Sequence, residues 1–108
     1  MRSEVERRER SRRPVDLSVW VSVGRQSGAF RRVPVIDLSS NGVAIDLNGE
    51  QPPMGDHLIL LLPDPTDADL MHEIHGIVAY SSPQRVGVRL EVFAAEAMAA
   101  VLSFLNSQ

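Results

Sequence analysis

Apolar and polar residues alternate along two long stretches of the chain. In residues 15–23 every odd-numbered position is apolar, and the positions between them are mostly polar. Residues 85–92 repeat this alternation. A period of two is typical of a half-buried β-strand, whose side chains point in turn to the two faces of a sheet. Trp20 falls on the polar face of the first stretch, where it would cover an edge of the fold or offer a stacking surface.

Four further apolar segments lie between these two stretches, and turn-forming residues separate them. They span residues 30–36, 42–47, 57–62 and 71–80. Pro34 predicts an edge strand or a bulge in the first segment. The apolar run 57–62 predicts a central strand, and Gly76 suggests a bend in the last segment. The pattern therefore predicts six strands.

The period changes near the C-terminus. In residues 94–105 apolar side chains recur at intervals of three and four, at Met98, Val101, Leu102 and Leu105. That spacing predicts a short amphipathic α-helix, whose apolar stripe must be buried. Six short antiparallel strands followed by one helix predict a mainly β protein. We expect a small six-stranded antiparallel β-barrel with the helix covering one open end.

The chain has 108 residues, which is the size of one compact domain. It contains no Cys, which excludes disulfides, thiolate metal sites and a cysteine nucleophile. The charged N-terminus does not have the pattern of a signal peptide. The longest aliphatic run, residues 58–62, is far too short to cross a bilayer. We therefore expect a soluble, cytoplasmic protein that is not inserted into a membrane.

Charge is unevenly distributed. The net charge is −3, all 11 basic residues are Arg, and six of them lie within residues 1–13. We interpret residues 1–13 as a flexible arginine-rich arm and residues 14–108 as a single domain. Arg presents a planar fork that matches phosphate and stacks on flat rings, so the arm suits a planar ligand that carries phosphates. The alternative interpretation is a solvated tail whose composition follows a GC-rich genome.

No arrangement typical of catalysis or metal binding is evident. His72 and His75 are three apart on a predicted strand and so point to opposite faces, and His57 has no evident partner. The acidic loop at residues 63–69 lacks the ligand order of an EF-hand. Neither a phosphate-binding glycine loop nor a nucleophile elbow is found. We therefore predict a protein without catalytic residues, metal ligands or a cofactor.

The loop at residues 37–42 carries more polar groups than a turn requires. Asn41 and Gly42 would supply the turn through a positive φ angle. Asp37 and Ser39 are additional, and they lie on one side if strand geometry continues through them. A carboxylate can accept hydrogen bonds from both N–H donors on the Watson–Crick edge of guanine, and a hydroxyl can add a contact. Gly42 would permit close approach to the loop backbone.

Arg8 and Arg12 are four residues apart in the arm. On a helical turn they would share one face, and in an extended arm they would surround a ligand. Two adjacent guanidinium groups repel each other unless an anion lies between them, and phosphate is the natural anion. The arm and the loop together therefore indicate a ligand with phosphates and stackable bases, with guanine as the favoured base.

At these positions the sequence resembles a known family. The stretch Arg8-Glu9-Arg10-Ser11-Arg12 matches the RxxxR motif of PilZ domains, and Asp37-Leu38-Ser39-Ser40-Asn41-Gly42 matches their [D/N]xSxxG motif. The resemblance covers the chain from Arg7 to the terminal helix. It implies a six-stranded antiparallel barrel that binds the bacterial second messenger cyclic di-GMP. The ligand-binding residues that it implies are Arg7, Arg8, Arg12, Asp37, Ser39 and Gly42.

The resemblance also implies a role for each group. Arg8 and Arg12 would contact phosphates and stacked guanines, and Asp37 and Ser39 would contact the guanine edge. Arg7 stands where members of the family can carry an Arg that helps to hold a second, intercalated ligand molecule. Its presence favours binding of the ligand as a stacked dimer.

The expected function is that of a non-catalytic receptor or adaptor. The arm would order over the ligand and create a surface for an unknown partner protein in motility, biofilm formation or exopolysaccharide export. We expect residues 81–89 to border the pocket. One alternative is a protein-interaction module of the same fold that binds no nucleotide. Binding to nucleic acid is disfavoured by the acidic body and by an aromatic content of only 5%.

Overall fold

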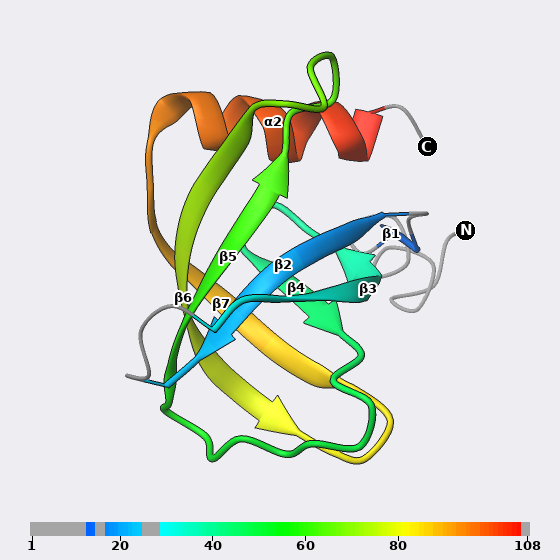
Figure 1. Cartoon of the computed structure of the whole chain (residues 1–108), viewed down its shortest axis with the longest axis vertical. Helices are drawn as coiled ribbons and strands as arrows, with labels where there is room; N and C mark the ends of the chain where they lie inside the picture. The colour runs from blue at the N-terminus through cyan, green and yellow to red at the C-terminus, as the bar shows by residue number, and fades with distance from the viewer. Residues whose placement is uncertain (1–12, 15–16, 25–28, 107–108) are drawn as a thin grey trace, which may run out of the picture.

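The computed structural model describes residues 13–14, 17–24 and 29–106 (Figure 1). The six strands and the helix expected from the sequence are all present, and β1 is an additional, very short strand. Most of the arginine-rich arm lies outside the described residues. The elements are β1 (Arg13–Pro14), β2 (Ser18–Val23), β3 (Arg31–Leu38), β4 (Gly42–Ile45), β5 (His57–Pro63), β6 (Met71–Ser81), β7 (Val86–Phe93) and α2 (Ala95–Asn106).

The six longer strands form a closed antiparallel barrel. Hydrogen bonds link them in the order β3-β2-β5-β6-β7-β4, and β4 pairs in turn with β3. Closure of this kind removes the sheet edges that would otherwise expose unpaired backbone groups. β1 adds two residues beside the end of β3, where Arg13 and Pro14 lie opposite Leu38 and Asp37.

A register shift interrupts β3 where it pairs with β4. Val35 and Asp37 have partners on β4, and Ile36 between them has none. Such a bulge bends the strand and increases its local twist. Pro34 therefore correctly indicated an irregularity in this strand. The alternative prediction from Pro34, an edge strand, was wrong, because β3 pairs with β2 on one side and with β4 on the other.

β6 has two register shifts against β7. One falls between His75 and Gly76, where the sequence suggested a bend, and the other between Val78 and Tyr80. The second shift leaves Ala79 without a partner. In a regular strand Ala79 and Tyr80 would point to opposite faces. Here both line the same hollow on the outer wall of the barrel.

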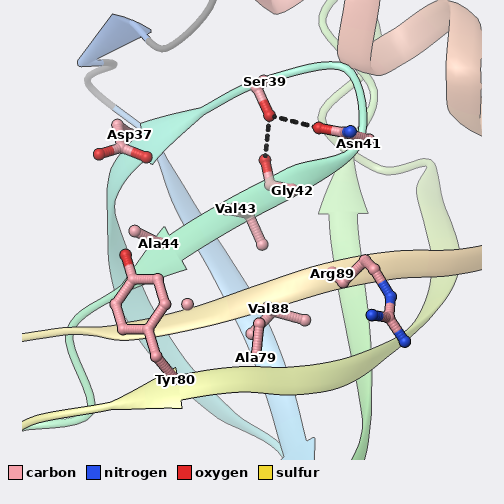
Figure 2. A pocket seen from close by; sticks show the side chains of 11 residues that line it. Asp37, Ser39, Asn41, Gly42, Val43, Ala44, Ala79, Tyr80, Val88 and Arg89 are labelled. Carbon is pink, nitrogen blue, oxygen red and sulfur yellow. Dashed lines mark hydrogen bonds between the residues drawn. The ribbon is translucent and has the colours of Figure 1, made fainter. Parts of the chain in front are cut away.

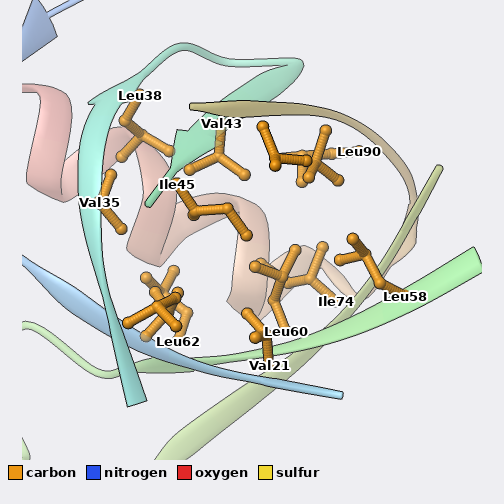
Figure 3. Packing of buried hydrophobic residues seen from close by; sticks show 14 of the residues in the cluster. Val21, Val35, Leu38, Val43, Ile45, Leu58, Leu60, Leu62, Ile74 and Leu90 are labelled. Carbon is orange, nitrogen blue, oxygen red and sulfur yellow. The ribbon is translucent and has the colours of Figure 1, made fainter. Parts of the chain in front are cut away.

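Because side chains alternate along a strand, the apolar ones point into the barrel (Figure 3). In β5, Leu58, Leu60 and Leu62 have at most 3% of their surface exposed, and the residues between them are half-buried. β5 pairs with β2 on one side and β6 on the other, so the prediction of a central position for this strand is confirmed. The barrel interior is therefore the hydrophobic core of the protein.

α2 lies across one end of the barrel and packs against β5 and β6 (Figure 1). Its buried residues are Ala97, Ala100 and Val101, and Leu105 is partly buried against the core. Leu102, assigned to the apolar stripe from the sequence, is instead 42% exposed. Ala97 and Ala100, and not Leu102, lie beside Val101 on the buried face. In the described part of the chain, no helix combines the length and apolar character that crossing a membrane requires.

Replacing Leu58 with Ala should test whether the barrel interior is the core. We expect Leu58→Ala to lower the free energy of unfolding in urea by about 2–5 kcal/mol, because the closed barrel cannot collapse into the space left behind. Leu102→Ala is the matched control, and it should cost about 1 kcal/mol or less because 42% of this Leu is already exposed. Equal losses in the two variants would contradict the assignment.

Candidate functional site

A hollow of about 220 Å³ lies on the outer wall of the barrel, next to the loop between β3 and β4 (Figure 2). Asp37, Ser39 and Gly42 line one side of it, and residues of β6 and β7 line the other. The three loop residues singled out from the sequence therefore come together around one cavity. We call this cavity the outer-wall hollow.

β3 carries Asp37 to the outer-wall hollow. Asp37 lies opposite Ala44, next to the pair formed by Leu38 and Val43. Because Leu38 and Val43 are core residues, the alternation of the two strands turns Asp37 and Ala44 to the outside. Asp37 was expected in a loop but belongs to β3, and the loop itself is only residues 39–41.

Asp37 has a counter-ion in the turn between β6 and β7. Arg85 donates a hydrogen bond from Nη2 to Asp37 Oδ2 and forms an ion pair with it. The two side chains are 34% and 19% exposed, respectively. Ser82 fixes this turn, since its N–H donates to the Arg85 carbonyl at 2.9 Å and its Oγ accepts from the Arg85 N–H at 3.2 Å. The guanidinium group is therefore presented from an ordered turn.

Arg85 links Asp37 to an aromatic ring. Its guanidinium carbon lies 5.9 Å from the centroid of the Tyr80 ring, within reach of a cation–π interaction. Burial by itself would lower the pKa of Arg85, but the hydrogen bond and charge of Asp37 outweigh burial, and the pKa is raised. Its Nε is buried without a hydrogen-bond partner among the described residues.

Tyr80 gives the outer-wall hollow a flat apolar surface. Its ring lies directly on Gly87, its partner on β7, and a Cβ at residue 87 would collide with the ring. Glycine is therefore the residue that lets the ring lie against the strand. Both residues line the hollow. An aromatic face in such a position can stack on a nucleic acid base.

Ser39 closes the short loop. Its N–H donates to the Gly42 carbonyl at 2.8 Å. Its Oγ lies 3.1 Å from Asn41 Oδ1 and 3.2 Å from the Gly42 carbonyl oxygen (Figure 2). A hydroxyl has one hydrogen, so it serves one of these acceptors at a time, and its lone pairs can still accept a hydrogen bond from a ligand.

Gly42 is needed for close approach rather than for the turn. Neither Asn41 nor Gly42 has a positive φ angle, so that prediction was wrong. A Cβ at residue 42 would lie 3.3 Å from the Val88 carbonyl oxygen and 3.6 Å from Ser39 Oγ. The first of these distances is tighter than ordinary van der Waals contact. The missing side chain therefore lets β4 approach β7 beside the hollow.

Arg7, Arg8 and Arg12 lie outside the described residues, so their placement stays a prediction. The chain that follows them is described from β1, where Pro14 lies opposite Asp37. The arm therefore joins the barrel beside the outer-wall hollow.

Sequence reasoning did not identify Tyr80 and Arg85. No short motif contains them, and they reach the loop only because β7 pairs with both β6 and β4. One indication was available, since residues 81–89 were expected to border the pocket. Gly87, Val88 and Arg89 do line it.

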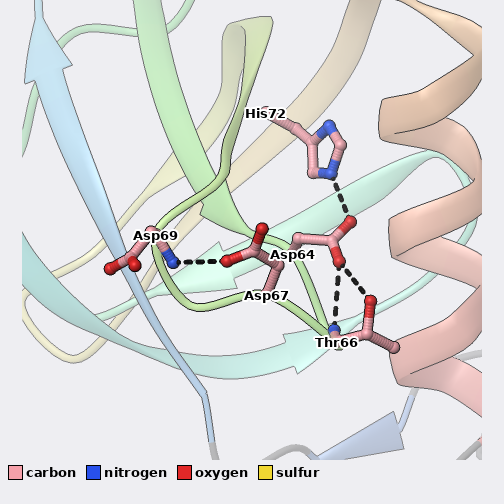
Figure 4. Close-up of polar contacts among 5 residues, drawn as sticks. All are labelled: Asp64, Thr66, Asp67, Asp69 and His72. Carbon is pink, nitrogen blue, oxygen red and sulfur yellow. Dashed lines mark hydrogen bonds and ion pairs between the residues drawn. The ribbon is translucent and has the colours of Figure 1, made fainter.

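A second hollow, of about 310 Å³, lies between the acidic loop and α2. At its rim, Asp64 Oδ1 is 2.8 Å from His72 Nε2, and Asp64 Oδ2 accepts hydrogen bonds from the N–H and Oγ1 of Thr66 (Figure 4). These hydrogen bonds lower the pKa of Asp64 from 3.8 to about 2, with His72 making the largest contribution. The Asp69 N–H donates to Asp67 Oδ1, so this loop satisfies part of its own backbone.

His57 does have a partner, contrary to the sequence interpretation. Its Nε2 lies 3.1 Å from His75 Nδ1 on the neighbouring strand, and His75 Nε2 lies 2.7 Å from Glu73 Oε2. His72 instead contacts Asp64. Among residues 13–14, 17–24 and 29–106, no group of three or more His, Cys, Asp or Glu side chains is arranged to hold a metal ion.

The architecture and the hollow are those of one class of protein. It is a closed six-stranded antiparallel barrel with one helix across its end and, on its outer wall, a cavity lined by both polar and apolar side chains. The family model of the PilZ domain matches residues 6–107. The chain therefore belongs to the PilZ domain family, whose members are typically non-catalytic receptors.

Among solved structures, the chain is similar to the Bacillus subtilis inhibitor of motility MotI/DgrA. The two share 20% sequence identity with a TM-score of 0.71, over 90% of this chain and 48% of that one. At this identity the likeness concerns the fold alone. The chain thus spans about half the length of that protein. None of the curated proteins compared with the chain matches it.

Asp64 should remain ionised in more acidic solution than an ordinary aspartate. Its folded pKa of about 2 lies below the ordinary value of 3.8. The stability it contributes is therefore fully present above about pH 4 and is lost as the pH falls towards 2. A titration of the side-chain carboxyl carbon by NMR should give a midpoint near 2, and His72→Phe should move it upward. A midpoint near 3.8 in the parent protein would show that the two hydrogen-bonding groups do not hold the carboxylate.

Proposed function

We propose that this chain binds cyclic di-GMP at the outer-wall hollow and acts as a non-catalytic receptor. The observation that carries the proposal is the meeting of Asp37, Ser39 and Gly42 around one cavity that also has an aromatic wall. Membership of the PilZ domain family supports it independently. In this proposal residues 14–108 form the binding domain, and residues 1–13 form an arm that closes over the ligand.

The chemistry of the cavity suits guanine. The Watson–Crick edge of guanine offers adjacent N–H donors, and the Asp37 carboxylate is an acceptor with two oxygens. Ser39 Oγ can add one further hydrogen bond. The Tyr80 ring supplies a face on which a planar base can stack, and such stacking contributes about 1–3 kcal/mol per base. Each of these groups lines the same cavity.

The size of the cavity indicates which part of the ligand it would hold. Ligand pockets usually measure about 300–1,000 Å³, and the outer-wall hollow has only about 220 Å³. It therefore suits one base rather than a whole cyclic dinucleotide. The phosphates and the second base would lie outside it, where further groups must bind them.

The arm is suited to supply those groups. β1 pairs with the end of β3 at Asp37, so the arm begins next to the cavity. We infer that Arg8 and Arg12 bind the phosphates and stack on guanine, and that Arg7 helps to hold a second, intercalated ligand molecule. Ordering the arm costs about 1–2 kcal/mol per backbone residue. Several charge-assisted hydrogen bonds to phosphate would offset that cost.

The ordered arm would form a new surface for a partner protein. A structural relative of the chain is an inhibitor of motility, and control of motility, biofilm formation or exopolysaccharide export is the process we propose. The partner protein itself is unidentified.

One observation favours the second candidate, an interaction module that binds no nucleotide. Asp37 has a counter-ion within the chain, Arg85, so its charge does not require a ligand for compensation. A binding experiment separates the two candidates.

Calorimetry with cyclic di-GMP tests the proposal directly. We expect the parent chain to bind, and Asp37→Ala, Arg8→Ala and Arg12→Ala each to weaken binding by at least about tenfold, the loss expected for one charge-assisted hydrogen bond. Asp69→Ala is the control for Asp37, because this carboxylate lies outside the hollow.

Stoichiometry tests the role of Arg7. About two ligand molecules per chain, falling to one in Arg7→Ala, is the expected result, and one per chain in the parent removes that role. A parent chain that releases no heat with cyclic di-GMP would leave the nucleotide-free interaction module as the function.

A further inference from the structure

Arg85 and Asp37 contact each other directly. Arg85 Nη2 binds one carboxylate oxygen, Asp37 Oδ2. Among the described residues, no hydrogen bond to Asp37 Oδ1 is found. Arg85 itself does not line the outer-wall hollow, whereas Asp37 does. Arg85 therefore contacts the carboxylate without itself lining the cavity.

We propose that Arg85 is a positioning residue for guanine recognition, which orients the Asp37 carboxylate toward the edge of the base. This inference rests on the proposed function. It assigns specificity for guanine to a residue outside the two family motifs.

The geometry leaves Asp37 able to bind both partners. An ionised carboxylate has about four acceptor positions on its two oxygens, and a single Arg N–H occupies one of them. The remaining positions can receive the two adjacent N–H groups of guanine. Arg85 need not leave when the base arrives. It also supplies the positive charge that a partly buried carboxylate requires.

Arg85 can orient Asp37 only if it is held in place itself. Ser82 makes three hydrogen bonds across the turn that carries it. Its guanidinium carbon lies 5.9 Å from the centroid of the Tyr80 ring, and the missing side chain of Gly87 leaves room for that ring. Its Nε is buried, although the side chain as a whole is 34% exposed. The carboxylate is therefore preorganised, which raises affinity by reducing the ordering required on binding.

Two other roles of Arg85 predict different effects on ligand affinity. If Arg85 competed with guanine for Asp37, removing it would tighten binding. If Arg85 contacted the ligand directly, its loss would add to the loss of Asp37. The experiment is chosen to separate these possibilities.

Calorimetry on the full chain uses two ligands, cyclic di-GMP and its analogue with hypoxanthine in place of guanine. The analogue lacks the exocyclic amino group, so it can offer Asp37 only one N–H. We expect the parent to prefer cyclic di-GMP by about tenfold. Arg85→Gln should weaken cyclic di-GMP binding by about tenfold and bring the preference close to one, because the carboxylate is no longer aligned with both donors.

A double-mutant cycle tests whether Arg85 acts through Asp37. In the Asp37→Ala background, adding Arg85→Gln should cause no further loss of affinity. Arg85→Lys keeps the charge without the planar fork and should recover part of both affinity and preference. Arg31→Gln is the matched control, because Arg31 is an exposed, ion-paired Arg on the same strand as Asp37 and should bind as the parent does.

The outcomes separate this inference from the proposed function. If the parent binds cyclic di-GMP and Arg85→Gln binds equally well or more tightly, the inference is overturned and the proposed function stands. Additive losses in the cycle also overturn it, in favour of direct contact. If the parent does not bind cyclic di-GMP, both the inference and the proposed function are overturned. The preference is the ratio of the two affinities, and both are measured on the same folded molecules. A loss of stability in a variant therefore cannot change this ratio.

Discussion

Closure of the barrel by β4 is the constraint on which the rest of the structure depends. β4 has only four residues, yet it pairs with β3 on one side and β7 on the other. Val43 and Ile45 fill the barrel, while Ala44 faces out beside Asp37. Without these pairs two long strands would have open edges, which favour aggregation. The same four residues carry the loop to β7, so the closure that stabilises the barrel also builds the outer-wall hollow.

The hollow shows how a barrel can carry polar chemistry without disturbing its core. Strand alternation keeps apolar side chains inside and leaves the outer positions open to other residues. A bulge at Ala79 then brings Tyr80 to the outside as well. Arg85 supplies a counter-charge to the Asp37 carboxylate, which is only 19% exposed. The orienting role that we propose for this ion pair is tested by binding rather than by unfolding.

The parts of the fold that follow from local patterns were predicted well. Alternation identified two of the strands, apolar segments between turn-forming residues identified four more, and spacing of three and four identified the helix. The wrong predictions concern positions where residues distant in the sequence determine the burial or the conformation. Leu102 was assigned to the apolar stripe of the helix, but it is exposed, whereas Ala97 and Ala100 are buried beside Val101. Gly42 was assigned to a turn conformation, whereas contact with β7 explains its lack of a side chain. Arg85 and Tyr80 belong to no local pattern that reaches the loop.

By itself, the sequence determined the strands, the helix, the uneven charge and the two motifs, because periodicity and motif spacing are properties of neighbouring residues along the chain. The tertiary structure alone decided which groups meet. Asp37 and Arg85 are 48 residues apart, and only the register of four strands, with their bulges, brings them into contact. Register depends on how the whole barrel closes and packs, and one residue of slip would send Asp37 to the opposite face. The motif could therefore be recognised in the sequence, whereas the residue that orients it could not.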